Sequence, residues 1–333
     1  MRADPRSSLR MAVLMGGPSP EHAITLKSGR GVTEALTARG WSVQPIVLPN
    51  DSSIEETRAI CRSALLRESI DVAFVALHGA FGEDGTVQRL LDELQILYTG
   101  SDAAASALGM DKLASRQRFA AAGLVVPRWR LIERARLPKE DIELAIRGFQ
   151  MPVVVKPTNQ GSSIGVSIVT EAAQLAPALE EAFRYDTHVL IDAFIRGREL
   201  TVGIVGEEAL PVVEVRPKRA FFDYAAKYTP GQTEYLVPAP IPSELAAQAQ
   251  QAARRAHQAL GCRHFSRVDL IADEDSVPVV LEVNTIPGMT AMSLLPKAAA
   301  CREQSYDELC EQIVLMACAG ARRPSRLAAQ GAR

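Results

Sequence analysis

The sequence predicts an α/β protein that begins with a parallel sheet, and two observations support this prediction. Short apolar segments at residues 11–15, 43–48 and 72–77 alternate with helix-length segments at residues 23–37 and 54–66. Strands separated by helices in this order are typical of a parallel sheet with helices on its faces. The first strand also runs into Gly16-Gly17-Pro18, and a strand that ends in a glycine turn before a helix is a common ligand-binding layout.

Bulk properties narrow the class of protein. The 333 residues are more than one typical core accommodates, so we expect two or three domains. A net charge of -2 gives no indication of a nucleic-acid or membrane surface. The five cysteines are scattered and form no CxxC pair, which favours reduced thiols in the cytoplasm over disulfides or a zinc site. We expect no signal peptide and no membrane-spanning segment.

The third strand leads into a glycine-rich loop. His78 follows this strand, and the loop at residues 79–85 has three glycines but no GxGxxG pattern, so a dinucleotide site is not supported. A plain strand-to-helix turn stays open as the alternative. Glu83 and Asp84 are interpreted as turn residues.

A lysine and a flexible turn follow in the middle of the chain. After a helix at residues 111–122 and strands at 129–132 and 151–157, Lys156 precedes the glycine- and serine-rich flap at residues 158–166. Backbone N–H groups in such a turn can approach an anion. The order differs from a Walker loop, so Lys156 is either an edge charge or a phosphate ligand.

The second half continues with mixed elements. Residues 189–195 form a candidate hinge segment for adenine, and residues 199–205 and 210–215 are expected as antiparallel strands. Residues 218–235 lack a helix or strand period, and we interpret them as a lid. Helices are expected at residues 243–260 and 306–317, and the Arg-rich tail from residue 320 is expected to be disordered.

Two strands bring carboxylates together near residue 280. Arg267 and Asp269 lie two apart on one strand, and Glu282 and Asn284 lie two apart on the next, so each pair shares a face. Buried carboxylates need a positive partner. Because hard cations bind carboxylate and amide oxygens, these strands predict a magnesium site that carries a nucleotide polyphosphate.

In combination, these motifs resemble the D-alanine–D-alanine ligases of the ATP-grasp superfamily, from about residue 10 to residue 318. The resemblance rests on eight segments in the same order: residues 16–21, 76–86, 98–101, 110–112, 155–165, 222–228, 267–269 and 281–290. It implies a three-domain ATP-grasp architecture in which two α+β domains grip ATP. The implied parts are a disordered leader (1–9), an N-terminal substrate-binding domain (10–108), a central domain with the flap (109–192), a C-terminal domain with lid and metal site (193–318) and an Arg-rich tail (319–333).

The resemblance implies the synthesis of D-alanyl-D-alanine for peptidoglycan precursors. ATP would phosphorylate one D-alanine, and the amino group of a second would attack the acyl phosphate. The implied cofactors are ATP and two Mg²⁺ ions, which Mn²⁺ may replace. The implied setting is a cytoplasmic homodimer with no nucleic-acid or membrane partner.

The resemblance also implies site residues. Those implied for the chemistry are Glu21, Ser162, Tyr228, Arg267 and the N–H of Gly288. Those implied for the substrates are His78, Ser293 and the N–H of Leu294. Those implied for ATP are Lys112, Lys156, Gly161, Ser163, Asp192, Ile195, Glu199 and Lys227. Those implied for metal are Asp269, Glu282 and Asn284.

The sequence departs from the family pattern in three places, and two other functions stay open. Asp192 stands where the family usually has Glu, Asn159-Gln160 replaces a more charged pair, and Met292 stands where some relatives carry His. Tyr228 in the lid favours D-alanine over D-lactate as second substrate. The alternatives are another ATP-grasp carboxylate–amine ligase and an inactive nucleotide-binding regulator.

Overall fold

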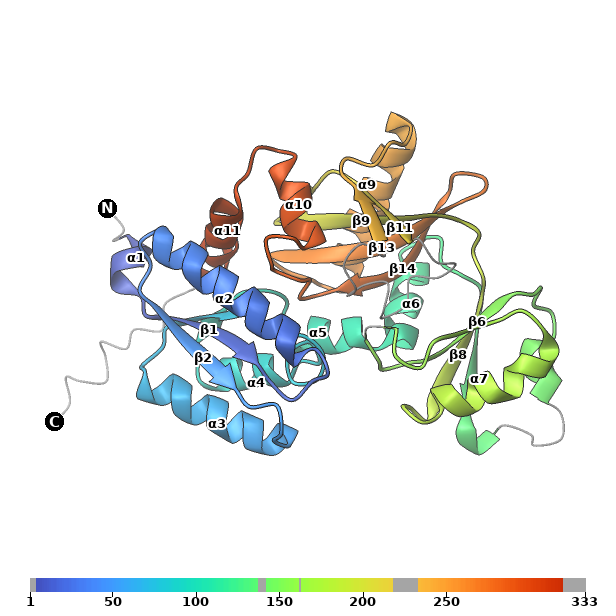
Figure 1. Ribbon diagram of the computed structural model, residues 1–333, viewed down its shortest axis with the longest axis horizontal. Helices are drawn as coiled ribbons and strands as arrows, with labels where there is room; N and C mark the ends of the chain where they lie inside the picture. Colours follow the sequence, from blue (N-terminus) through green and yellow to red (C-terminus); the bar gives the residue numbers. More distant parts are fainter. Residues whose placement is uncertain (1–3, 137–141, 162, 218–232, 320–333) are drawn as a thin grey trace.

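The computed structural model describes residues 4–136, 142–161, 163–217 and 233–319. These residues form three β-sheets that follow one another along the chain, with helices packed on them (Figure 1). Within these ranges, none of the helices combines the length and the apolar character that a membrane crossing requires.

The first sheet is parallel, as the sequence predicted, and its strand order is β2-β1-β3-β4. Its elements are β1 (Met11–Gly16), α2 (His22–Ala38), β2 (Val43–Leu48), α3 (Ile54–Arg67), β3 (Val72–Val75), α4 (Thr86–Glu93), β4 (Leu97–Tyr98) and α5 (Ala103–Met110). Met11 and Val13 face the core shared with α2, whereas Ala12 and Leu14 face the core shared with α3 and α4. The carboxyl ends of the parallel strands therefore lie at the same end of the sheet, where the glycine turn after β1 is also found.

The second sheet is antiparallel and has the order β5-β8-β6-β7. Its elements are β5 (Trp129–Glu133), the 3-10 helices Arg134–Arg136, Ile142–Ile146 and Ala172–Gln174, β6 (Val153–Pro157), β7 (Ser167–Val169), α7 (Leu175–Ala182) and β8 (His188–Ala193). Helix α6 (Lys112–Ala121) precedes them and buries Phe119 in the core of the third sheet. Since β6 and β7 pair as a hairpin, the flap between them lies at the edge of this sheet.

The third sheet has the order β12-β11-β9-β13-β14, with β10 paired to β9. Its elements are β9 (Gly197–Val205), β10 (Glu208–Ala209), β11 (Val213–Pro217), β12 (Thr233–Leu236), α9 (Ser243–Ala259), β13 (Phe265–Asp273), β14 (Pro278–Asn284) and α10 (Leu294–Ala300). Helix α9 buries Ala249 and Ala253 against the sheet. Helix α10 packs closely on β9, because a Cβ on Gly203 would lie 2.5 Å from the side chain of Leu295.

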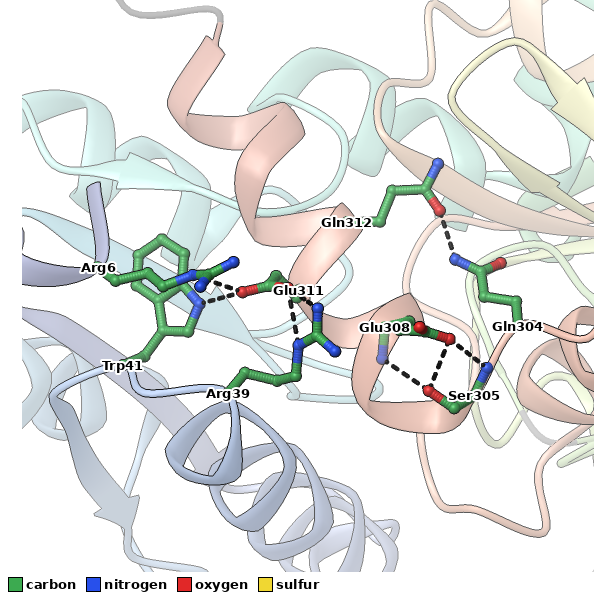
Figure 2. Close-up of polar contacts among 8 residues, drawn as sticks. All are labelled: Arg6, Arg39, Trp41, Gln304, Ser305, Glu308, Glu311 and Gln312. Carbon is green, nitrogen blue, oxygen red and sulfur yellow. Dashed lines mark hydrogen bonds and ion pairs between the residues drawn. The ribbon is translucent and has the colours of Figure 1, made fainter. Parts of the chain in front are cut away.

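The C-terminal helix α11 (Tyr306–Ala319) returns to the first sheet and is held there by a buried carboxylate (Figure 2). Glu311 accepts hydrogen bonds from Arg39 Nε at 2.8 Å and from Trp41 Nε1 at 3.1 Å. Arg6 Nε forms an ion pair with Glu311 Oε1 at 2.9 Å. Helix α11 thereby joins the last part of the described chain to its first part.

The structure differs from the sequence prediction at two segments. The expected disordered leader contains a short helix, α1 (Pro5–Ser8), in its described part. Asp4 caps this helix through Arg6 N, and the ion pair of Arg6 with Glu311 holds it on α11. The expected lid ends earlier than predicted, because residues 233–236 form strand β12 on β11. The remainder of the lid and the Arg-rich tail from residue 320 lie outside the described residues.

Candidate active site

The paired strands β13 and β14 form the floor of the site. Asp269 lies opposite Glu282 and Arg267 lies opposite Asn284 in the antiparallel register. A β-bulge between Asp269 and Leu270 leaves Leu281 without an opposite residue and shifts the alternation beyond it. Because directly opposite residues share a face, the four polar side chains converge as the sequence predicted.

Asp269 is the electrostatic centre of this floor. Its carboxylate accepts two hydrogen bonds from Arg267, at 2.9 and 2.8 Å. Thr201 Oγ1 donates to it at 2.6 Å, and Asn284 Nδ2 donates at 2.9 Å. Arg267 therefore supplies the positive charge that this half-buried carboxylate requires.

The donor set on these strands suits a hard cation. In the described part of the chain, no three His, Cys, Asp or Glu side chains are gathered as a metal cluster. The expected set is two carboxylates and one amide oxygen, from Asp269, Glu282 and Asn284, which is the ligand chemistry that Mg²⁺ accepts. The side chains lie on adjacent strands in register, so the residues fit the ion that the sequence predicts.

A cavity of about 650 Å³ opens above these strands. Ten of the predicted site residues line it: Glu21, His78, Lys112, Gly161, Arg267, Glu282, Asn284, Gly288, Ser293 and Leu294. They come from all three sheets and from the loop between β14 and α10, so segments more than two hundred residues apart in the sequence meet in one space.

One end of the cavity is built from the loops that follow β1 and β3. His78 Nδ1 is 3.0 Å from the carbonyl oxygen of Ile286, and its Nε2 has no hydrogen-bond partner in the described residues. Burial lowers the pKa of His78, and the opposing effects of Glu21 and the Ile286 carbonyl do not reverse this. His78 is therefore a neutral side chain at pH 7, with one ring nitrogen available to a ligand.

Glu83 also belongs to this end, although the sequence indicated only a turn residue. It lines the cavity, and its carboxyl group accepts the N–H of Gly79 at 2.7 Å. Burial, followed by the charge of Glu21, raises the pKa of Glu83 to about 8. Asp84 does form the turn, since it accepts the N–H groups of Phe81 and Thr86 at 2.9 Å each. The sequence does carry a signal for Glu83, because it is an acid in the glycine-rich loop that follows His78.

The other end of the cavity carries positive charge and the flap. Lys112 is the first residue of α6, and its Nζ donates to the carbonyl oxygen of Gln160 beside Gly161. Ser163 has a positive φ of 59°, which accords with a shaping role in the flap. Lys112 and the flap backbone thus offer donors on the same side of the cavity.

A buried ion cluster lies behind this end. Asp192 on β8 pairs with Lys156 Nζ at 2.7 Å and with Arg116 Nη1 on α6. Burial opposes ionisation of Asp192, but the two cations outweigh it and lower its pKa. The carboxylate that the sequence indicated for adenine is therefore directed at Lys156 and Arg116.

The remaining predicted residues are distributed as follows. Among the described residues, those of the predicted set that do not line the cavity are Lys156, Ser163, Asp192, Ile195, Glu199 and Asp269. Those that lie outside the described residues are Ser162, Lys227 and Tyr228. Tyr235 and Lys297 line the cavity without having been predicted, and Lys297 Nζ lies 5.1 Å from the centre of the Tyr235 ring. A cation on a helix and an aromatic residue at a strand end carry no sequence signal for such a contact.

Comparisons with known proteins agree on one family. Residues 119–315 match the family model "D-ala D-ala ligase C-terminus", and residues 50–101 match "D-ala D-ala ligase N-terminus". The chain is 44% identical over 317 residues to the D-alanine–D-alanine ligase of Geotalea uraniireducens, covering 95% of this chain and 98% of that one. It is 45% identical over 305 residues to the ligase of Anaeromyxobacter sp. (strain Fw109-5), covering 92% and 96%.

Solved structures give the same answer for the fold. The D-alanine–D-alanine ligase of Bacillus anthracis complexed with ATP has a TM-score of 0.78 at 33% identity, covering 93% of this chain and 98% of that one. The VanG D-Ala:D-Ser ligase of Enterococcus faecalis has a TM-score of 0.79 at 28% identity, covering 93% and 99%. The fold is that of an ATP-dependent ligase with the ATP-grasp architecture. The chain belongs to the D-alanine–D-alanine ligase family.

Proposed function

We propose that the protein joins two molecules of D-alanine at the expense of ATP. The observation that supports this most strongly is the single cavity in which carboxylate strands, a lysine beside the flap and the His78 loop meet. The terminal phosphoryl group of ATP is transferred to the carboxylate of the first D-alanine, and ADP leaves. The amino group of the second D-alanine attacks the acyl carbon, and the C–O bond to phosphate breaks. Both steps need charge neutralisation and alignment more than a covalent catalyst.

The roles proposed for individual residues are those that the resemblance to the D-alanine–D-alanine ligases implies. Glu21 pairs with the ammonium of the first D-alanine, and neutral His78 contacts its carboxylate. Arg267 and the N–H of Gly288 stabilise the developing oxyanion. Ser293 and the N–H of Leu294 bind the carboxylate of the second D-alanine. Ser162 and Tyr228, which lie outside the described residues, are proposed as partners of Glu21 at the flap and the lid.

The ATP half has its own set of residues. Lys112, Lys156 and Lys227 contact phosphates, with Gly161 and Ser163 in the flap above them. Asp192 and Ile195 border the adenine, and Glu199 binds the ribose. Two Mg²⁺ ions, which Mn²⁺ may replace, would be held by Asp269, Glu282 and Asn284 and would neutralise phosphate charge. The proposed setting is a cytoplasmic homodimer that supplies D-alanyl-D-alanine for peptidoglycan synthesis, and the proposed domain limits are residues 10–108, 109–192 and 193–318.

A second candidate differs in the second substrate. VanG of Enterococcus faecalis is a D-Ala:D-Ser ligase, so the same fold serves another nucleophile in that protein. Exposed Met292 lies at the cavity, near Ser293. A ligase for D-serine or D-lactate is therefore the alternative that a product assay must separate.

The test is a product assay with ATP, magnesium and each of D-alanine, D-serine and D-lactate beside D-alanine. We expect D-alanyl-D-alanine as the main product, with one phosphate released per dipeptide. A depsipeptide with D-lactate and no dipeptide from D-alanine alone would contradict the proposal.

Replacement of Glu282 tests the metal assignment. Glu282→Gln keeps the volume and removes the charge, so turnover should fall by about 100- to 1,000-fold with an unchanged melting temperature. The matched control is Glu274→Gln, in the exposed turn between the same strands, which should leave turnover intact. Turnover near the wild-type rate in Glu282→Gln would refute the assignment.

A further inference from the structure

The loop between β14 and α10 is fixed to distant parts of the chain. The carbonyl oxygen of Ile286 contacts His78 Nδ1 at 3.0 Å, which ties the loop to the first sheet. Within the loop, the N–H of Thr290 donates to Ser293 Oγ at 3.1 Å. Gly288 lies between these two anchors, and a Cβ added there would lie 2.9 Å from Ser293 Oγ. The backbone at Gly288 is thus closely confined.

Met289, the residue after Gly288, is held at both its backbone groups by different helices. Its N–H donates to Ser28 Oγ on α2 at 3.4 Å. Its carbonyl oxygen accepts the hydroxyl of Tyr306, the first residue of α11, at 2.6 Å. Met289 itself is fully buried. Since a glycine has the widest choice of backbone conformations, fixing the residue next to it removes much of that freedom.

The packing around Tyr306 is adapted to its hydroxyl. A Cβ on Gly31 in α2 would lie 3.0 Å from this oxygen, so the glycine provides the space in which the hydroxyl lies. Burial raises the pKa of Tyr306, so the hydroxyl stays protonated and remains a donor. Helices α2 and α11 therefore enclose the donor on one side and present it to the loop on the other.

We infer that Tyr306 is a positioning residue that sets the orientation of the Gly288 N–H through the carbonyl of Met289. This rests on the proposed role of that N–H as an oxyanion donor. Such donors act because they are fixed before the charge develops, and a displacement of about 1 Å can cost about 100-fold in rate. Among the described residues, the Tyr306 hydroxyl hydrogen-bonds the Met289 carbonyl and no predicted substrate, metal or ATP residue, so the proposed effect runs through the loop.

The experiment compares Tyr306→Phe with Tyr98→Phe. Tyr98 is buried, whereas Tyr306 is half-buried, and the Tyr98 hydroxyl donates to Asp92 Oδ1 on α4 at 2.9 Å. Each variant loses one hydroxyl hydrogen bond and keeps its ring. We expect Tyr306→Phe to lower kcat by about tenfold, which is less than the loss of about 100-fold that a displacement of about 1 Å can cost. The Kd for magnesium-ATP should be unchanged. We expect Tyr98→Phe to keep the wild-type kcat.

Hydrogen exchange gives a readout that does not depend on turnover. Amide exchange in the peptide spanning residues 284–293 should be faster in Tyr306→Phe than in the wild-type chain and unchanged in Tyr98→Phe. Equal exchange in all three proteins would overturn the positioning role, whether or not the wild-type chain makes dipeptide. Equal loss of kcat in both variants would likewise overturn it, because the effect would then be a general loss of stability. A wild-type chain that makes no dipeptide would instead overturn the proposed function.

Discussion

The side chain of Asp192, for which a ligand contact was expected, forms a buried ion cluster in the structure. Asp192 is buried and faces two cations, Lys156 and Arg116, and two nitrogens of Arg116, Nε and Nη2, have no hydrogen-bond partner among the described residues. Lys156 is thus held by a carboxylate before any phosphate arrives. The charge of Asp192 is therefore directed at Lys156 and Arg116.

We predict that Asp192→Asn destabilises the chain and weakens ATP binding. Removing one partner of a buried ion pair leaves uncompensated charge and costs about 3–5 kcal/mol. The free energy of unfolding from urea denaturation measures the first effect, and the Kd for magnesium-ATP measures the second. Glu93→Gln is the control, because its pairs with Arg58 and Arg62 are exposed and should contribute about 1 kcal/mol or less. Equal losses in the two variants would show that Asp192 has no special role.

Residue-level sequence reasoning succeeded where the geometry is local. The alternation along β13 and β14 put Arg267, Asp269, Glu282 and Asn284 on one face, and the register confirms it. It failed where partners are distant, since Arg116 lies 76 positions from Asp192 and no periodicity links them. The resemblance indicated a ligand contact for Asp192 but could not reveal a side chain that competes for the same carboxylate.

At the scale of elements, α11 illustrates the same limit. Its amphipathic pattern predicted a helix at residues 306–317, and the structure has one at Tyr306–Ala319. The pattern did not indicate that Glu311 would be buried, nor that Arg6 would hold a short helix against it. An acid on the apolar face of a helix is a signal that a distant cation must approach, but not which one.

The Glu311 cluster gives a pH prediction. Burial opposes ionisation of Glu311, but hydrogen bonds from Arg39 and Trp41 and the charge of Arg6 outweigh it and lower its pKa below the ordinary 4.5. The unfolded chain therefore binds a proton at higher pH than the folded chain does. The stabilisation is complete above the unfolded pKa and is lost as the pH falls through the folded pKa.

The measurement compares Glu311→Gln with the wild-type chain across acidic pH. We expect the urea midpoint of the variant to be lower than that of the wild type at neutral pH, and the gap to narrow between about pH 5 and pH 3. Glu308→Gln is a useful comparison, since Glu308 lies on the same helix and caps it through Ser305 (Figure 2). A gap that stays constant with pH would contradict the assignment of the charge to Glu311.

For the whole molecule, the central observation is that one cavity is lined from all three sheets. The sequence predicted the sheet of the first part and the strand that carries Lys156 in the second, because these strands follow short-range patterns. It could not derive how the sheets meet, because that depends on long-range packing such as α11 on α2 and His78 on Ile286. Only the resemblance to a family implied that arrangement in advance.

This arrangement predicts that the two substrates stabilise the protein cooperatively. A ligand at about one hundred times its Kd adds about 2.7 kcal/mol to the free energy of unfolding. On the proposed roles, a non-hydrolysable ATP analogue with magnesium would fix the elements around Lys112 and Glu282, whereas D-alanine would contact those around Glu21 and His78. The loop between β14 and α10, which contains Ile286, joins the two groups of elements. Binding of the first ligand should therefore reduce the free-energy cost of ordering the elements around the second, with a coupling of about 1–3 kcal/mol.

Thermal denaturation with the ligands alone and together checks this coupling. We expect D-alanine to raise Tm more in the presence of the ATP analogue than in its absence, and the analogue to bind more tightly when D-alanine is present, because the coupling is reciprocal. L-alanine is the matched control, since it has the same charges and volume with the opposite configuration, and it should give little shift in either condition. Equal shifts by D-alanine with and without the analogue would mean that the two ends of the cavity act independently, and the loop that carries Gly288 would then not transmit binding between them.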